Sequence, residues 1–383
     1  MAMAGPFDGV RILDFSAVLS GPMATALLAD QGADVIKVEP PEGDTTRALG
    51  PAKGNMSAMF IAANRGKRSI VIDLKSAAGR ALALDLAARA DVLVENFRPG
   101  AMARLGLDHG SVAARNPRIV YLSISGYGQT GPASGERVYD AVVQAASGVA
   151  AAHRTPHTGE PMLLATAVCD KVTALTAAQA LSAALFARER DGRGRHIDLS
   201  MLDAALAFQW PDAMYNHVFL DEPPARLPEF GSSTRLWKTA DGHIATMAPQ
   251  QVEFIALCKA LGRADIAEDP RFSSYAARSR NGPAMRAVIE PLIAKWRTDD
   301  LMAAMKSAGA PAGRASEREE VLADPQVAHN AALVEVGHGA LGRVRLARSA
   351  ARFDGDAPPV PGPAPELGAD GPAILSELGC TEE

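Results

Sequence analysis

The sequence has few of the features that mark disulfide-stabilised, exported or membrane proteins. It contains three cysteines, Cys169, Cys258 and Cys380, widely spaced and without a C-x-x-C pair, so no disulfide framework or cysteine metal site is expected. No uncharged apolar run reaches the roughly 18 residues of a membrane span. The first residues also lack the basic stretch and apolar core of a signal peptide. We therefore expect a cytoplasmic protein that does not bind membranes.

Charge and motifs exclude further classes of protein. Lys and Arg total 39 against 44 Asp and Glu, a net charge of −5, and no basic run forms a nucleic-acid surface. No G-x-G-x-x-G motif follows the first predicted strand, as a nicotinamide-binding fold would require. His153 and His157 have the spacing of a helical metal pair, but Pro156 between them breaks the helix. Small-molecule partners and no metal site are expected.

The pattern along the chain predicts an α/β fold. With 383 residues, of which 48% are hydrophobic, the chain is long enough for two cores. Its first half alternates short β-branched runs with Ala/Leu-rich helical stretches, which is typical of a doubly wound parallel sheet. The predicted strands are residues 10–15, 34–39, 69–74, 92–96, 119–123 and 196–199. The predicted helices are residues 22–31, 77–90 and 170–188, with another beginning at 201.

A change in composition near residues 221–229 predicts a linker between two units. This stretch is rich in proline and charged residues, which suits an inter-domain connection. A second unit is expected to begin near residue 232 with a hairpin of residues 236–239 and 243–247. Helices near 252–261 and 284–296 follow, and a short strand is expected near 344–346.

Asp170 is the candidate nucleophile. An ordinary aspartate has a pKa of about 3.9, so it is ionised at neutral pH and can act as a nucleophile without a general base. Burial would raise this pKa, and a position at a helix N-terminus would oppose the rise. The alternative is that Asp170 only caps the helix, since aspartate is among the commonest N-cap residues.

Candidate binding residues follow the predicted strands. Residues 96–100, Asn-Phe-Arg-Pro-Gly, end a strand, and with Arg104 they bring two guanidinium groups to the edge where open α/β sheets bind ligands. The glycine-rich residues 125–132 form either a lid or a surface turn. Arg137 and Tyr139 offer a cation and a phenol, although solvated arginines and structurally paired tyrosines are common alternatives.

Motifs spread over nearly the whole chain resemble those of the class III CoA-transferases, the CaiB/BaiF family. They are Leu-Asp-Phe at 13–15, Ser-Gly-Pro at 20–22, Gly-Ala-Asp-Val-Ile-Lys-Val-Glu at 32–39, Asn-Arg-Gly-Lys-Arg at 64–68, Asp-Leu-Lys at 73–75, Val-Glu-Asn-Phe-Arg-Pro-Gly at 94–100, Ser-Gly-Tyr-Gly-Gln-Thr-Gly-Pro at 125–132 and Gly-Arg-His-Ile-Asp-Leu-Ser-Met-Leu-Asp at 194–203. Such a series of matches in order is more specific than any single motif.

The resemblance implies roles for individual residues. Asp170 matches the family's nucleophilic aspartate, and Arg137 and Tyr139 match residues beside the thioester. The other positions that match cofactor contacts of the family are Leu74, Lys75, Asn96, Phe97, Arg98, Arg104 and Met201. Coenzyme A and acyl-CoA would be substrates, together with a small carboxylic acid, and no metal or redox cofactor would be required.

The resemblance also implies an architecture. The expected fold is a large Rossmann-like domain built from residues 1–221 and 325–383, plus a small α+β domain of residues 222–324. Two such subunits would interlock as threaded rings in an obligate homodimer.

The chemistry implied is CoA transfer through an aspartyl anhydride and an aspartyl-CoA thioester on Asp170. The alternative is α-proton exchange, as in α-methylacyl-CoA racemases, which share the fold and need an acid–base pair. Those racemases are expected to have a histidine where this chain has Tyr139, whose phenol is a poor proton acceptor at neutral pH. A CoA-binding protein without turnover is a third hypothesis, against which Asp170 and Tyr139 argue.

Overall fold

The computed structural model describes residues 5–155, 158–222, 224–232, 234–355, 359–360 and 362–379. The chain divides into two compact units, a larger one of Met1–Phe208 with Pro325–Glu383 and a smaller one of Gln209–Asp324. The larger unit ends close to the end of helix α9 (Met201–Gln209), and the proline-rich residues 221–229 fall within the smaller unit.

Six parallel strands form the main sheet of the larger unit within its described residues. Their order is β5-β2-β1-β6-β7-β8, made of β1 (Arg11–Asp14), β2 (Asp34–Glu39), β5 (Arg68–Val71), β6 (Val92–Glu95), β7 (Val120–Ser125) and β8 (Arg195–Ser200). The chain winds outward from β1 to β5 and then returns to β6 and winds the other way. This is the Rossmann strand order, so the predicted doubly wound parallel sheet is present, with its switch point between β1 and β6.

Helices cover both faces of this sheet, and each strand sends alternate apolar residues to opposite layers. Ile12, Val94 and Leu122 pack in the core shared with α1 (Ser20–Ala29) and α8 (Val168–Asp191). Leu13, Leu93 and their neighbours pack in the opposite core. The helices that follow strands on that side are α3 (Ala77–Ala88), α4 (Ala101–Leu105) and α5 (His109–Ala113).

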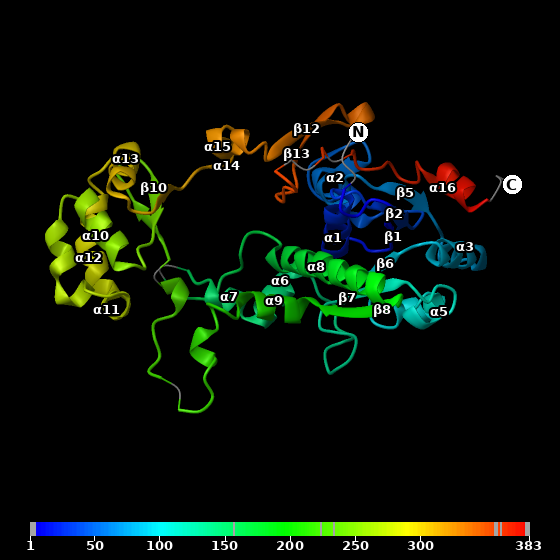
Figure 1. Cartoon of the computed structure of the whole chain (residues 1–383), viewed down its shortest axis with the longest axis horizontal. Helices are drawn as coiled ribbons and strands as arrows, with labels where there is room; N and C mark the ends of the chain where they lie inside the picture. The colour runs from blue at the N-terminus through cyan, green and yellow to red at the C-terminus, as the bar shows by residue number, and fades with distance from the viewer. Residues whose placement is uncertain are drawn as a thin grey trace. The chain divides into compact units, whose positions relative to one another are not determined.

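The C-terminal segment returns to the larger unit. Its hairpin of β12 (Leu333–Gly337) and β13 (Arg343–Ala347) packs against α2 (Ala58–Asn64), and α15 (Pro325–His329) precedes it. Helix α16 (Gly371–Leu378) lies beside β5, as the red helix next to the blue strand in Figure 1. The Ser69 N–H donates to Asp370 across this contact at 2.8 Å. The C-terminal segment therefore packs against the sheet at β5 without adding a strand to it.

The smaller unit is a three-stranded antiparallel sheet packed with helices. Its strand order is β11-β10-β9, with β9 (Leu236–Lys238), β10 (His243–Thr246) and β11 (Ala312–Arg314). The predicted hairpin is present, and the predicted helices correspond to α10 (Gln251–Ala260) and α12 (Gly282–Ile293). Sequence analysis missed β11, which has three residues, as well as α11 (Tyr275–Arg280), α13 (Thr298–Ala308) and α14 (Arg318–Leu322).

A buried network of charges lies beneath the carboxyl end of β1. The Lys67 ammonium, 0% exposed, contacts the equally buried Asp14 carboxylate at 2.9 Å. Asp14 also accepts hydrogen bonds from the Ser16 N–H at 2.9 Å and the Thr25 hydroxyl at 2.7 Å. Burial alone would raise the pKa of Asp14, but the charges of Lys67 and Lys37 lower it to about 2. Asp14 therefore stays ionised at neutral pH, and the positive charges of Lys67 and Lys37 stabilise it in this form.

Replacing Lys67 with methionine tests this network. We expect Lys67→Met to lower the free energy of unfolding by about 3–5 kcal/mol, because one cation of a buried carboxylate is lost. The neighbouring Arg68→Gln provides the control, since Arg68 pairs with Asp34 and Glu377 at a partly exposed site. Its cost should be about 0–1 kcal/mol. Equal losses of stability in urea denaturation would contradict a special role for the buried pair.

Candidate active site

The loop between β1 and α1 lies at the switch point of the sheet. Asn96, directly after β6, accepts a hydrogen bond from the Ala17 N–H and donates one to the Ala17 carbonyl, both at 2.8 Å. Next to Ala17, Val18 has a φ of 68°, an uncommon conformation for a β-branched residue. At the start of α1, a Cβ on Gly21 would lie 2.3 Å from Ser16, so only glycine fits. The predicted cofactor residue Asn96 thus has a structural task in holding this loop.

Asp170 lies in the first turn of α8, and its carboxylate reaches across to α1. Because α8 begins at Val168, Ala167 holds the N-cap position, and the hypothesis that Asp170 is the N-cap is wrong. The carboxylate instead accepts hydrogen bonds from the backbone N–H and the hydroxyl of Ser20, the first residue of α1. It therefore lies at the positive ends of two helix dipoles, an environment that stabilises an anion.

Opposing effects set the protonation of Asp170. Burial, followed by the nearby negative charge of Asp140, raises the pKa of Asp170 to about 6. The hydrogen bonds from Ser20 and the charge of Lys171 act in the opposite direction. The carboxylate is consequently ionised at neutral pH, yet it is more basic than an ordinary aspartate.

Asp140 and Gln144 hold the start of α8 in place. Asp140 is the first residue of α6 (Asp140–Ser147), and one of its oxygens accepts the Asp170 N–H at 2.9 Å. Its other oxygen accepts a hydrogen bond from the Gln144 amide at 2.6 Å. Gln144 also accepts from the Leu164 N–H at 2.9 Å and donates to the Thr166 carbonyl at 3.1 Å. Sequence reasoning missed the roles of Asp140, Gln144 and Ser20, because their contacts with Asp170, Leu164 and Thr166 join residues at least 20 positions apart in the chain.

Most of the predicted cofactor residues follow the carboxyl ends of parallel strands, and these ends lie at one edge of the sheet. Leu74 and Lys75 follow β5, Phe97 and Arg98 follow β6, Arg104 lies on α4, and Met201 opens α9 after β8. The side chains of Lys75, Arg98 and Arg104 are exposed, whereas Met201 is buried. The fold thus brings these segments to the edge that also carries Ser20 of α1.

The glycine-rich loop after β7 is fixed at its beginning. A Cβ on Gly126 would lie 2.0 Å from a methyl group of Val138, and the Gly126 carbonyl accepts the Leu202 N–H at 3.0 Å. Arg137 and Tyr139 flank Val138, and both side chains are exposed, Tyr139 to 73%. Movement of this loop as a lid stays a prediction.

Glu95, at the end of β6, is a buried acid that sequence reasoning did not select. Its carboxylate accepts the Phe97 N–H at 2.8 Å and so shapes the turn that carries Phe97 and Arg98. Burial raises the pKa of Glu95 to about 7, with the charge of Asp198 adding to the rise. A hydrogen bond from Ser123 opposes it. The signal in the sequence was an acid at the end of an otherwise apolar strand.

The pKa of Glu95 predicts a pH dependence of stability. The folded state holds this proton more tightly than the unfolded state, so unfolding free energy should fall as pH rises from about 4.5 through about 7. Relative to the Glu95→Gln variant, the wild-type protein should lose on the order of 2 kcal/mol between pH 5 and pH 8 in urea denaturation. The exposed Glu136→Gln variant serves as control and should keep the wild-type slope; an equal slope in all three proteins would contradict the prediction.

The described residues contain no group of three or more His, Cys, Asp or Glu side chains that could hold a metal ion. His157 and Pro156 lie outside the described residues, as does Cys380, while Cys169 and Cys258 are buried free thiols. None of the described helices is long and apolar enough to cross a membrane.

Comparison with known proteins gives consistent results over nearly the whole chain. The family model described as CoA-transferase family III matches residues 7–371. The chain is 38% identical to succinate–glutarate CoA-transferase of Agrobacterium fabrum over 395 residues, covering 98% of this chain and 96% of the relative. It is 36% identical to acetyl-CoA:oxalate CoA-transferase of Acetobacter aceti, covering 99% and 97%. The structure of a CaiB/BaiF family protein from Brucella suis superposes with a TM-score of 0.83 at 34% identity, covering 98% of this chain and 100% of the other. The chain therefore belongs to CoA-transferase family III, the CaiB/BaiF family.

Proposed function

We propose that this protein transfers CoA from an acyl-CoA donor to a carboxylic acid, with Asp170 as the group that carries the acyl and CoA intermediates. The observation that carries the proposal is the Asp170 carboxylate held by Ser20 at the start of α1, at the ligand-binding edge of a Rossmann-type sheet. Relatives named as CoA-transferases for glutarate and oxalate support the same reaction class.

The reaction proceeds in four displacements at carbonyl carbon. An Asp170 oxygen attacks the donor thioester, the carbon–sulfur bond breaks, and a mixed anhydride and CoA thiolate form. The thiolate attacks the aspartyl carbonyl carbon, which releases the donor acid and leaves an aspartyl-CoA thioester. The acceptor carboxylate attacks this thioester, forms a second anhydride and expels the thiolate. The thiolate finally attacks the acceptor's carbonyl, which releases the new acyl-CoA and restores the Asp170 carboxylate.

The residues at the strand ends suit a ligand with phosphate groups and a long chain. Lys75, Arg98 and Arg104 are exposed cations at this edge and would attract the phosphates of CoA. Phe97, Leu74 and Met201 offer apolar contacts to the remainder of the cofactor. Arg137 is the cation that would stabilise negative charge developing on the thioester oxygen, and Tyr139 would lie beside it.

The alternative, α-proton exchange on an acyl-CoA, needs an acid and a base on either side of the α-carbon. Tyr139 supplies only a phenol, and both oxygens of Asp140 already accept hydrogen bonds, from the Asp170 N–H and from Gln144. These contacts favour a positioning role for Asp140 and therefore favour transfer over proton exchange.

The first test replaces the nucleophile. Asp170→Asn keeps the size of the side chain but removes the anion, so we expect normal folding and a loss of transfer of at least about 10³-fold. Hydroxylamine added during turnover of the wild-type protein should convert Asp170 to its hydroxamate, which peptide mass spectrometry would locate.

Two outcomes would contradict the proposal. Full activity of Asp170→Asn, or hydroxamate at a different residue, would remove Asp170 from the reaction. Deuterium uptake at the α-carbon of the acyl group in D₂O would support proton exchange instead, because transfer alone leaves those hydrogens in place.

The pH dependence of the rate provides a second test. Because attack requires ionised Asp170, kcat/KM should rise with pH through about 6 and level off above about 7. Ser20→Ala removes a hydrogen bond to the carboxylate and should move the midpoint to higher pH. Asp140→Asn removes a neighbouring negative charge and should move it to lower pH. Shifts in the same direction would contradict this account, and thermal melting would identify any variant that fails to fold.

The identity of the acceptor acid and the number of subunits in the assembly can be tested separately. Dicarboxylic acids such as glutarate and oxalate belong in the first substrate panel, because relatives are named for them. The interlocked homodimer and the cytoplasmic location stay predictions from the family resemblance and the sequence. Light scattering of the purified protein would measure the mass of the assembly.

A further inference from the structure

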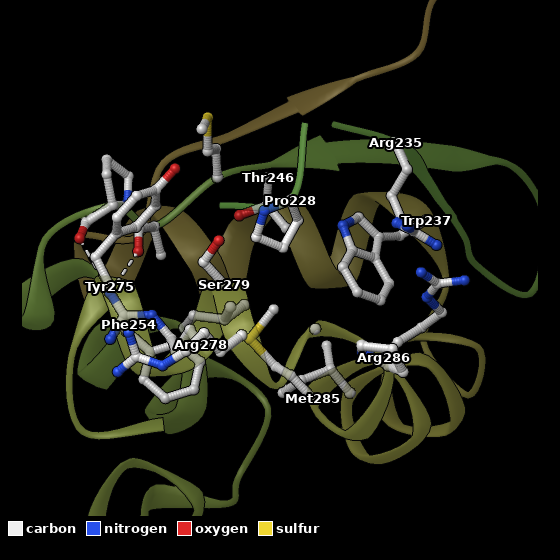
Figure 2. A pocket seen from close by; sticks show the side chains of 18 residues that line it. Pro228, Arg235, Trp237, Thr246, Phe254, Tyr275, Arg278, Ser279, Met285 and Arg286 are labelled. Atoms are coloured by element: carbon white, nitrogen blue, oxygen red, sulfur yellow. Dashed lines mark hydrogen bonds between the residues drawn. The ribbon is translucent and has the colours of Figure 1, made fainter. Parts of the chain in front are cut away.

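The smaller unit contains a cavity of its own, formed entirely by residues of Gln209–Asp324. Its volume is about 410 Å³, within the range of pockets that hold small organic ligands. Aromatic and aliphatic side chains form much of its wall, among them Trp237, Phe254, Tyr275 and Met285. Figure 2 shows Trp237 at one end of this cavity, with Phe254 and Tyr275 at the other.

The charged residues of the wall are all of one sign. Arg235, Arg278, Arg280 and Arg286 line the cavity, and its described lining contains no aspartate or glutamate. Arg278 is buried and donates its hydrogen bonds to neutral acceptors, the Gln251 amide oxygen and the backbone carbonyls of residues 248, 249 and 272. These contacts fix the guanidinium without neutralising its charge.

Two of the arginines lie close together at the Trp237 end (Figure 2). Burial, followed by the charge of Arg286, lowers the pKa of Arg235, which indicates that the two guanidinium groups repel each other. The Glu290 carboxylate opposes this shift, but it does not line the cavity. An anion bound between Arg235 and Arg286 would relieve the repulsion.

Two donors at this end have no acceptor among the described residues. The indole Nε1 of Trp237, a side chain that is 8% exposed, is buried without a hydrogen-bond partner, and so is Nε of Arg286. Buried donors in folded proteins nearly always have an acceptor, so two unsatisfied donors in one cavity wall indicate a site for an acceptor group.

We propose that this cavity binds an organic carboxylate with an aromatic or similarly bulky apolar body. The carboxylate would accept hydrogen bonds from Nε1 of Trp237 and Nε of Arg286, while the apolar body would pack on Met285 and Phe254. A planar carboxylate suits arginine, which can donate two parallel hydrogen bonds to it. A free inorganic anion would leave the apolar wall uncovered, and an uncharged arene would leave Nε1 of Trp237 and Nε of Arg286 without an acceptor.

The test uses the full-length protein and a fluorinated probe. We expect 4-fluorophenylacetate to bind, as measured by ¹⁹F NMR titration, and the uncharged 2-(4-fluorophenyl)ethanol to bind about tenfold more weakly or worse. Arg286→Gln should weaken binding of the carboxylate by about tenfold, and Trp237→Phe by about threefold, because each removes one donor. In both variants the affinity for the alcohol should change by a smaller factor than the affinity for the carboxylate.

The matched control is Arg263→Gln in the same unit. Arg263 is an exposed arginine paired with Asp265 at 2.6 Å, and it does not line the cavity, so binding should be unchanged. No binding of the carboxylate up to about 10 mM, equal binding of the alcohol, or an equal effect of Arg263→Gln would overturn the proposal. If Arg286→Gln does not fold, Trp237→Phe carries the test, since phenylalanine keeps an aromatic ring at the site.

The bound acid could be the acceptor of the proposed CoA transfer or a separate effector. A further arm of the experiment distinguishes these two roles. This arm rests on the proposed function. An acceptor site predicts that Arg286→Gln raises KM for the acceptor acid while hydroxamate formation at Asp170 with the donor is unchanged. An effector site predicts an unchanged KM. Absence of transfer in the wild-type protein would overturn the proposed function without affecting the binding result.

Discussion

The candidate active site depends on the buried ion pair between Lys67 and Asp14. Asp14 ends β1, and its carboxylate fixes the N–H of Ser16, the second residue of the loop that follows. Lys37 donates a hydrogen bond to the Ser16 carbonyl at 2.9 Å, and Asn96 holds the next residue, Ala17. With its path fixed, the loop delivers the backbone N–H of Ser20 to Asp170. Burying these charges would ordinarily destabilise a protein. Here the buried charges hold the loop in one conformation, so its end forms a rigid anion site.

The same reasoning explains why Asp170 can be both ionised and reactive. A fully solvated aspartate is ionised but weakly basic, whereas an unassisted buried one would be protonated and unable to attack. Two helix N-termini and the Ser20 hydroxyl act against burial and the charge of Asp140, and the pKa of about 6 reflects this balance. The carboxylate stays ionised at neutral pH while it retains more basicity than a surface aspartate. Asp140 raises this basicity and at the same time fixes the backbone of Asp170.

Local sequence patterns predicted the six strands of the main sheet and helices α1, α3, α8 and α9, because buried parallel strands and Ala/Leu-rich helices have distinct periodicities. They missed shorter helices of the larger unit, such as α2 and α6. They also predicted that residues 74–75, 96–98 and 201 lie at the same edge of the sheet, since the carboxyl ends of parallel strands meet there. The same patterns could not predict the contact of Ser20 with Asp170, the hydrogen bonds of Asp140 or the start of α8 at Val168. Each depends on how α1, α6 and α8 pack, and no local propensity encodes that packing. The alternative of Asp170 as the N-cap came from the frequency of aspartate at that position, which does not tell where the helix begins.

The anion sites that we propose in the two units would bind their ligands by different physical means. In the larger unit the candidate cations, Lys75, Arg98 and Arg104, are exposed at strand ends, so their attraction for a phosphorylated ligand is screened by salt and contributes mainly to association. In the smaller unit Arg278 is buried and Arg286 has a buried nitrogen without an acceptor. Salt and water would screen an ion pair formed there far less. A ligand that left these buried donors without an acceptor would therefore lose more binding free energy. The cavity of the smaller unit would therefore be better suited to discriminating between acids, and the exposed strand ends to a large ligand that many contacts hold.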